Sequence, residues 1–177
     1  MGSKAVDIHD GIDSTIMLVQ SRLNPSNKRL QIEVIKEYGN LPLVECYPGQ
    51  LNQVFLNILV NALDTLEDST LRGRWTTKKF NIIDNTRIYI RTQLLEPNQI
   101  TISIADNGLG IPSDTLKQIF NPFFTTKPVG QGTGMGLAIS YQIITQKHGG
   151  SLECISQPGV GAEFIIRIPL QQLVSNF

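Results

Sequence analysis

Two glycine clusters, one after a strand pattern and one before a helix pattern, constrain the fold of this chain more than any other feature. The first lies at residues 106–110, after the alternating apolar run 100–104, and the second at 130–137, where a helix pattern over 135–147 begins. Glycine has no Cβ, so backbone N–H groups in such turns can approach a ligand closely. A glycine-rich turn that opens a helix also favours anions. The pattern predicts an α/β fold whose loops bind phosphate groups.

A carboxylate stands at the end of the strand pattern before the first cluster. Asp106 lies where a buried acceptor could take a hydrogen bond from the exocyclic amine of adenine. The phenylalanine-rich segment 120–127, between the clusters, has the position of a lid. The common nucleotide motifs do not fit, because the chain has no Gly-x-x-x-x-Gly-Lys-Ser/Thr and Met135 replaces the third glycine of Gly-x-Gly-x-x-Gly. The sequence therefore predicts an ATP pocket with a lid, built on other motifs.

Residues 51–66 have the pattern of a strongly amphipathic helix. At about 100° per residue, its apolar side chains share one broad face: Leu51, Val54, Phe55, Ile58, Leu59, Ala62, Leu63 and Leu66. The opposite face carries Gln53, Asn57, Asn61 and Asp64. A face that only meets solvent normally carries Lys, Glu and Arg, whereas Asn is a poor helix former. The asparagines favour a site over a solvated face, since an amide oxygen can ligate Mg²⁺ beside phosphate charges.

Together these motifs resemble the ATP-binding catalytic domain of sensor histidine kinases, a group that shares its nucleotide fold with gyrase, Hsp90 and MutL. Four family motifs match in order: Asn57-x-x-x-Asn61-Ala62 (N box), Asp106-x-Gly108-x-Gly110 (G1 box), Phe120-x-Pro122-Phe123-Phe124-Thr125-Thr126-Lys127 (F box) and Gly132-Thr133-Gly134-Met135-Gly136-Leu137 (G2 box). The lid is similar to that of the nitrogen-regulation branch. The resemblance implies a two-layer α/β sandwich of the Bergerat type, with a mixed sheet of about five strands, three main helices on one face and an ATP lid.

The resemblance also implies roles for individual residues. Asn61 would hold Mg²⁺, Asn57 would lie near the γ-phosphate, Asp106 would bind the adenine amine, and Gly110 would let the base approach. Lys127 would reach the terminal phosphate and act with Asn57 in catalysis. The other expected nucleotide contacts are Asp64, Gly108, Phe120, Thr126, Gly132, Thr133, Gly134, Met135, Gly136 and Leu137.

Asn57 separates two branches of this family. The gyrase and Hsp90 branch has a glutamate at this position that activates water, and a general base must be titratable. Asn57 cannot accept a proton, which favours transfer of the γ-phosphoryl group of ATP to a histidine, assisted by Mg²⁺ and lysine. We therefore expect a protein histidine kinase with little ATPase activity. An ATP hydrolase or clamp, a non-catalytic nucleotide-sensing module and a serine kinase of the mitochondrial dehydrogenase-kinase type remain alternatives.

Neither of the two histidines fits the phosphate-accepting role. His148 precedes two glycines at the end of a predicted helix, which is typical of a helix terminus. His9 has an acidic neighbour, as in the family acceptor motif, but Ser14 stands where that motif has proline. The acceptor, and with it dimerisation, is expected on a hairpin domain absent from this chain. We expect the fragment to be monomeric and the parent kinase to act on a response regulator.

Composition suits one domain with a substantial core. The 177 residues are 41% hydrophobic and 17% charged, with no net charge. Zero net charge gives no support for binding to nucleic acid or to an anionic membrane, and no apolar run has the length of a transmembrane span. We expect a cytoplasmic location, with any membrane anchor of the parent outside this sequence. The predicted divisions are a leading helix and linker (1–28), the catalytic domain (29–172) and a tail (173–177).

The remaining patterns are local. A helix is predicted over 7–23, and strands over 29–38, 43–46, 87–95, 99–106, 151–156 and 162–168. Cys46 and Cys154 are expected to be reduced thiols, because their spacing fits no metal site. The segment 71–80 carries four basic residues around Trp75 and no acidic residue. A solvated insertion explains this segment, and so does a docking loop for the hairpin domain, a receiver domain or nucleotide phosphates.

Overall fold

The computed structural model describes residues 2–25, 31–71, 86–125 and 135–172. A five-stranded mixed sheet forms one layer, in the order β2-β4-β5-β7-β6. Its strands are β2 (Ile32–Tyr38), β4 (Thr86–Leu95), β5 (Gln99–Asp106), β6 (Ser151–Gln157) and β7 (Gly161–Pro169). The β2–β4 pair is parallel, and the other neighbouring strands are antiparallel. The mixed five-stranded sheet predicted from the sequence is confirmed.

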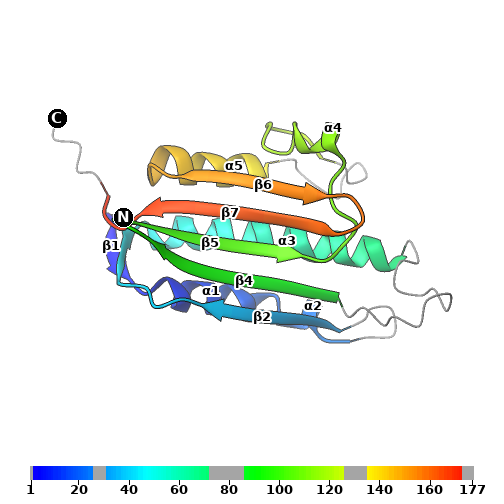
Figure 1. Cartoon of the computed structure of the whole chain (residues 1–177), viewed down its shortest axis with the longest axis horizontal. Helices are drawn as coiled ribbons and strands as arrows, with labels where there is room; N and C mark the ends of the chain where they lie inside the picture. The colour runs from blue at the N-terminus through cyan, green and yellow to red at the C-terminus, as the bar shows by residue number, and fades with distance from the viewer. Residues whose placement is uncertain (1, 26–30, 72–85, 126–134, 173–177) are drawn as a thin grey trace.

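The second layer consists of helices that cover one face of this sheet (Figure 1). Its main members are α1 (Ile8–Leu18), α3 (Pro48–Leu71) and α5 (Gly136–Gln142), which continues as the π-helical turn η1 (Ile143–Lys147). The central helix α3 contacts α1, α5 and β5. Every apolar residue predicted to share the core face of α3 is buried. Short α4 (Ser113–Leu116), which the sequence pattern did not predict, follows the first glycine cluster.

The N-terminal segment is built into the same core. Strand β1 (Lys4–Val6), which was not predicted, pairs antiparallel with β3 (Val44–Cys46) in a separate two-stranded sheet. Asp7 caps α1, since its Oδ1 accepts a hydrogen bond of 2.9 Å from the His9 backbone N–H. The buried apolar side chains of this segment are Ile8, Ile12, Ile16, Val19 and Leu23. The leading segment therefore packs as part of the domain; the predicted boundary at 28/29 lies outside the described residues, and the link to a hairpin stays a prediction.

Two helices predicted as continuous are interrupted. The pattern over 7–23 forms α1 and the short α2 (Gln20–Leu23), because Val19 leaves helical geometry with φ −104° and ψ 8°. The pattern over 135–147 changes from α to π geometry at Ile143. There the Ile143 carbonyl accepts hydrogen bonds from the His148 backbone N–H (3.2 Å) and the His148 ring Nδ1 (2.9 Å). Periodicity alone could not show this wider turn, because it depends on how one buried ring is bound.

His148 is a structural residue. Its side chain is 1% exposed, and its Nε2 accepts a hydrogen bond of 3.1 Å from the Tyr47 backbone N–H. Because Nε2 is the acceptor, Nδ1 carries the proton and donates to Ile143. The neutral ring thus ties the end of η1 to the loop before α3. This confirms the expectation that His148 ends a helix, and its burial leaves no access for a phosphoryl group.

Acid should destabilise the domain through this ring. Burial lowers the pKa of His148, only partly offset by its bond to the Ile143 carbonyl. The unfolded chain therefore binds a proton more readily than the folded one below pH of about 6.5. We expect the free energy of unfolding to fall as the pH drops from 7 towards 5, by at most about 1.4 kcal/mol per pH unit for this group. Denaturant titrations of wild type and His148→Gln should show a smaller fall for the variant; equal falls would contradict the assignment.

Both cysteines are free thiols, as predicted. Burial raises the pKa of Cys46 to about 11. Burial and the charges of Asp106 and Glu163 raise the pKa of Cys154 to about 12. Both thiols are therefore protonated at neutral pH. In the described part of the chain, no helix combines the length and apolar character needed to cross a membrane.

Candidate nucleotide site

Asp106 lies at the carboxyl end of β5, in the middle of the sheet. Its register partners are Ile88 on β4 and Ala162 on β7, and the residue is 7% exposed. Its Oδ1 accepts a hydrogen bond of 2.9 Å from the Gly108 backbone N–H. A carboxylate has about four acceptor positions and can accept from several donors at once. Asp106 is thus a buried, oriented acceptor of the kind that an adenine amine requires.

The loop 107–111 is fastened on two sides. Asn107 Oδ1 accepts a hydrogen bond of 2.7 Å from the Arg87 backbone N–H, at the start of β4. On the other side, the Gly159 N–H in the β6–β7 turn donates to the Leu109 carbonyl at 2.7 Å. These bonds hold this loop, which overlaps the G1 box and is called the G1 loop below, in a fixed position. A preorganised loop loses less conformational freedom when a base binds to it.

The local backbone conformation and the packing of the loop require glycine at position 110. Its φ of +78° lies in the left-handed region, and a Cβ there would stand 2.6 Å from the Gln157 carbonyl oxygen. The neighbouring Ile111 N–H donates to Ser156 Oγ at 2.5 Å. The family resemblance explained this glycine by the approach of the base. The structure adds a second reason, because Gly110 lets the loop pack against β6.

The N box meets the G2 box at the first turn of α5. Asn57 Nδ2 donates hydrogen bonds to the Gly136 carbonyl (3.0 Å) and to Ser140 Oγ (3.1 Å). The structure therefore brings together Asn57 and Gly136, which are 79 residues apart. Ser140 was missed by the sequence reasoning, although a serine inside an apolar helix pattern was a usable signal.

The second N-box residue, Asn61, lies one turn further along α3. Its backbone carbonyl accepts a hydrogen bond of 3.0 Å from Thr65 Oγ1. Among the described residues, no group of three His, Cys, Asp or Glu side chains could hold a metal. The donors that suit Mg²⁺ here are neutral amide oxygens, which need phosphate charges to complete a site. The magnesium role of Asn61 stays a prediction.

Asp64 has a protein partner. Arg22 Nη2, from α2, lies 2.7 Å from Asp64 Oδ1 and 2.9 Å from Glu67 Oε2. This ion pair fastens the leading segment to the N-box helix close to the predicted site. The predicted contact of Asp64 with nucleotide stays a prediction. No local signal pointed to Arg22, because it lies 42 residues before Asp64.

The F box begins with a ring that packs against the domain. The half-buried Phe120 ring lies 5.3 Å from the Tyr141 ring on α5 and 6.3 Å from the Phe164 ring on β7, between centroids. Phe123 is different: it is 76% exposed and has a φ of 66°, which is uncommon outside glycine. The start of the predicted lid thus has two rings packed against the core, Phe120 and Phe124, and one exposed ring, Phe123.

The predicted nucleotide contacts continue through the rest of the lid into the G2 box. Thr126, Lys127, Gly132, Thr133 and Gly134 lie outside the described residues. The described end of the G2 box starts at Met135, whose carbonyl accepts a hydrogen bond of 2.8 Å from the Ile139 N–H in α5. Leu137 packs against the hydrophobic core. The segment 72–85, with Trp75, also lies outside the described residues.

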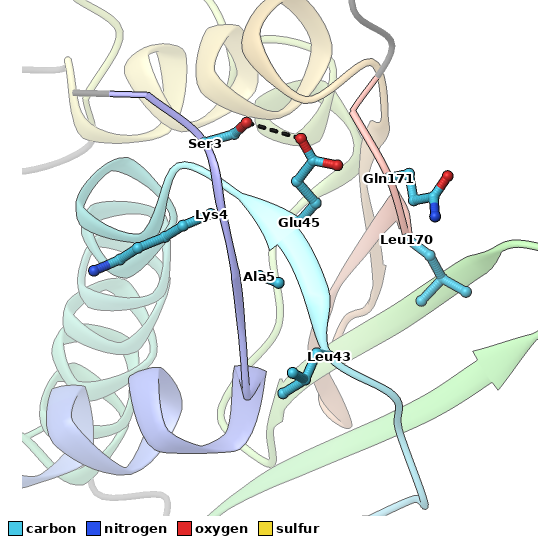
Figure 2. Close-up of a pocket in the computed structure, with 7 residues that line it drawn as sticks. All are labelled: Ser3, Lys4, Ala5, Leu43, Glu45, Leu170 and Gln171. Carbon is cyan, nitrogen blue, oxygen red and sulfur yellow. Dashed lines mark hydrogen bonds between the residues drawn. The ribbon is translucent and has the colours of Figure 1, made fainter.

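A shallow hollow lies at the other end of the sheet. Figure 2 shows it between β1, β3 and the residues after β7, with Ser3 Oγ donating to Glu45 Oε1 at 2.9 Å. Its volume is about 360 Å³. The Leu170 N–H donates to the Asn98 carbonyl just before β5, whereas Asp106 ends that strand. The hollow is therefore separate from the nucleotide site.

A family model, the "Histidine kinase-, DNA gyrase B-, and HSP90-like ATPase", matches residues 46–172. The chain belongs to this family. The match starts just before the N-box helix and includes all four boxes, so the domain is an ATP-binding domain of the kind that catalyses phosphorylation in sensor histidine kinases.

Relatives of this ATPase domain are sensor kinases. Sporulation kinase E of Bacillus subtilis is 35% identical over 158 residues, covering 89% of this chain and 18% of the relative. The signal transduction histidine-protein kinase AtoS of Escherichia coli is 36% identical over 166 residues, covering 93% of this chain and 24% of the relative. The chain thus spans about a fifth of the length of these relatives.

Solved structures agree with these relatives. The catalytic domain of histidine kinase ThkA, in a nucleotide-free form, has a TM-score of 0.75 and 27% identity, with 97% of each chain covered. The same kinase has been solved in complex with the response regulator protein TrrA; there the likeness is 24% identical with a TM-score of 0.69, covering 95% of this chain and 42% of the kinase. The ATPase domain of this chain therefore has the fold of a histidine kinase catalytic domain.

Proposed function

We propose that this domain transfers the γ-phosphoryl group of ATP to a histidine on a hairpin domain of its parent kinase. The parent would act in a two-component system with a response regulator, as ThkA binds TrrA. The domain would work as a monomer on the cytoplasmic side, where ATP is available. The observation that carries the proposal is the chemistry and hydrogen bonding of the Asn57 side chain. At the position of the water-activating base of ATP hydrolases stands an amide whose Nδ2 is bound to Gly136 and Ser140.

The two ends of ATP would have different partners in this domain. At one end, the buried Asp106 carboxylate would accept the adenine amine, beside the fastened G1 loop. At the other, Asn57 and Asn61 would lie on α3 near Mg²⁺ and the phosphates, with the G2 box from Gly132 to Leu137 alongside. Mg²⁺, held by Asn61 and phosphate oxygens, would supply positive charge that offsets the charge on the transferring group.

Catalysis would then depend on position. An amide at residue 57 provides no proton acceptor for water, so hydrolysis is slow while the γ-phosphoryl group waits for a nucleophile. His148 is buried and His9 lacks the proline of the acceptor motif, so the nucleophile would come from elsewhere. The missing imidazole would be supplied by the hairpin domain. Lys127 would approach the terminal phosphate from the lid and stabilise the charge there.

A reconstitution experiment tests this proposal. The chain is mixed with ATP labelled at the γ-position and with the parent's hairpin domain as a separate polypeptide. We expect label on the hairpin as an acid-labile, base-stable phosphate, and little free phosphate when the hairpin is absent. Acid-stable label would indicate a serine kinase. Free phosphate without the hairpin would indicate a hydrolase, and ADP binding without transfer would indicate a nucleotide-sensing module.

Lys127→Ala should separate transfer from binding. A lysine that neutralises charge in the transition state contributes mainly to rate, so we expect transfer to the hairpin to fall by about 10²-fold. ADP affinity, measured by calorimetry, should change by less than about threefold. Lys117→Ala, which removes an exposed lysine beside α4, is the control and should leave both unchanged. Equal losses of transfer and ADP binding in Lys127→Ala would contradict the role of this residue.

A further inference from the structure

Ser140 is a buried polar residue that none of the four family boxes includes. It lies in the second turn of α5 and is 0% exposed. Its hydroxyl donates to the Gly136 carbonyl at 2.8 Å, and its Oγ accepts from Asn57 Nδ2 at 3.1 Å. Burying a hydroxyl is costly unless it is hydrogen-bonded. One hydrogen bond of the hydroxyl is to Asn57 of the N box, and the other is to Gly136 of the G2 box.

The direction of each bond fixes the amide of Asn57. A serine hydroxyl has one proton, and that proton is used on the Gly136 carbonyl. While that bond is made, the hydroxyl can only accept from Asn57. The Gly136 carbonyl is also an acceptor, at 3.0 Å from Nδ2. If the amide rotated by half a turn, Oδ1 would face the Gly136 carbonyl, and the hydroxyl could donate to Oδ1 only by giving up its own bond to Gly136, so the orientation with Nδ2 against α5 is favoured.

In this orientation Oδ1, and not Nδ2, is the side-chain atom of Asn57 that can contact a ligand. Within residues 2–25, 31–71, 86–125 and 135–172, no hydrogen bond is made to Oδ1. The atom lies beside Gly136, 3.8 Å from the position that a Cβ on that glycine would have. An amide oxygen attracts a cation or a water molecule and repels a phosphate oxygen. An Asn57 with free amide rotation would present either atom.

We propose that Ser140 is a positioning residue, which holds Asn57 so that its Oδ1 faces the Mg²⁺–nucleotide complex. The inference rests on the proposed function, because it assumes that nucleotide binds at the N box. Without the hydroxyl, one of the two acceptors of Nδ2 disappears. Part of the Asn57 population would then present Nδ2 to the metal side. Removing the Ser140 hydroxyl should therefore reduce the gain in nucleotide affinity that Mg²⁺ provides.

Calorimetry with ADP, in the presence and absence of Mg²⁺, tests the proposal. The quantity compared is the factor by which Mg²⁺ increases ADP affinity. In Ser140→Ala we expect this factor to fall about three- to tenfold, while ADP affinity without Mg²⁺ changes by less than about twofold. Ser140→Thr keeps the hydroxyl and should keep the factor. A purely structural serine would lower thermal stability and leave the factor unchanged.

Thr145→Val is the matched control. Thr145 makes the same kind of bond as Ser140, with Oγ1 donating to the Tyr141 carbonyl at 2.7 Å, but on the exposed side of η1. This variant should keep the Mg²⁺ factor. An equal loss in Thr145→Val, or an unchanged factor in Ser140→Ala, would overturn the inference. Wild type that binds no ADP would overturn the proposed function, and this inference with it.

An NMR measurement on the wild type does not depend on the folding of any variant. The Nδ2 protons of Asn57, identified by their loss in Asn57→Asp, belong to a group with two hydrogen-bond acceptors within 3.1 Å. We expect them to exchange with solvent more slowly than the side-chain amide protons of exposed Asn residues, and to exchange faster in Ser140→Ala. Exchange in the wild type as fast as in exposed residues would overturn the orientation.

Discussion

Asp106→Asn should weaken ADP binding by about ten- to a hundredfold, which corresponds to about 1–3 kcal/mol. The carboxylate can accept from the Gly108 N–H and from an adenine amine at once. An asparagine has one oxygen and one NH₂ group. Whichever way it turns, its NH₂ opposes one of the two donors, so one bond is replaced by repulsion. The affinity of each variant would be measured by calorimetry.

Asp106→Asn should also change which nucleotide base the site prefers. Inosine diphosphate carries an oxygen where ADP carries the amine, so the wild-type carboxylate should reject it. The NH₂ of an asparagine at residue 106 could donate to that oxygen, and the preference for ADP should narrow. Asp114→Asn, an exposed change of equal charge on α4, should keep wild-type affinity and preference. If Asp106→Asn weakened both nucleotides equally, Asp106 would not contact the base.

The sequence was most informative where function and local pattern coincide. Alternation along 99–106 predicted β5, and the apolar face of 51–66 predicted the buried face of α3. Such periodicity reflects which side of an element is buried, and the core residues of both elements follow it. The motif order then indicated which strand ends and helix starts approach each other. Asn57 and Gly136, which the motifs assign to the same ligand, are in contact in the structure.

Features that depend on distant partners could not be predicted. Strand β1 exists because its backbone pairs with β3, about 40 residues away, and its own pattern of three residues is too short to read. The π-helical turn follows from a buried ring whose other nitrogen is bound by Tyr47, 101 residues earlier. Local propensity carries no information on such contacts. The hydrogen bond between Ser140 and Asn57 was equally unpredictable, since the two residues are 83 positions apart.

Gly110 offers the second large expected effect, with Gly159 as a matched control. Both glycines have left-handed φ angles, +78° and +83°. An alanine in this region costs about 1–2 kcal/mol. A Cβ at Gly159 would meet no atom within 4 Å, so Gly159→Ala should cost only this amount. At Gly110 a Cβ would stand 2.6 Å from the Gln157 carbonyl oxygen, which belongs to a paired strand. The crowding should add about 1–3 kcal/mol.

We therefore expect Gly110→Ala to lower the free energy of unfolding by about 2–5 kcal/mol, in denaturant titrations without nucleotide. To relieve the contact, the loop must move away from β6, and that movement displaces the Gly108 N–H from Asp106. ADP affinity should fall by about tenfold or more in Gly110→Ala and stay within about twofold in Gly159→Ala. Equal losses of stability in both variants would show that φ alone makes Gly110 necessary. A loss of stability in Gly110→Ala without a loss of affinity would separate the packing of the loop on β6 from its role at the base.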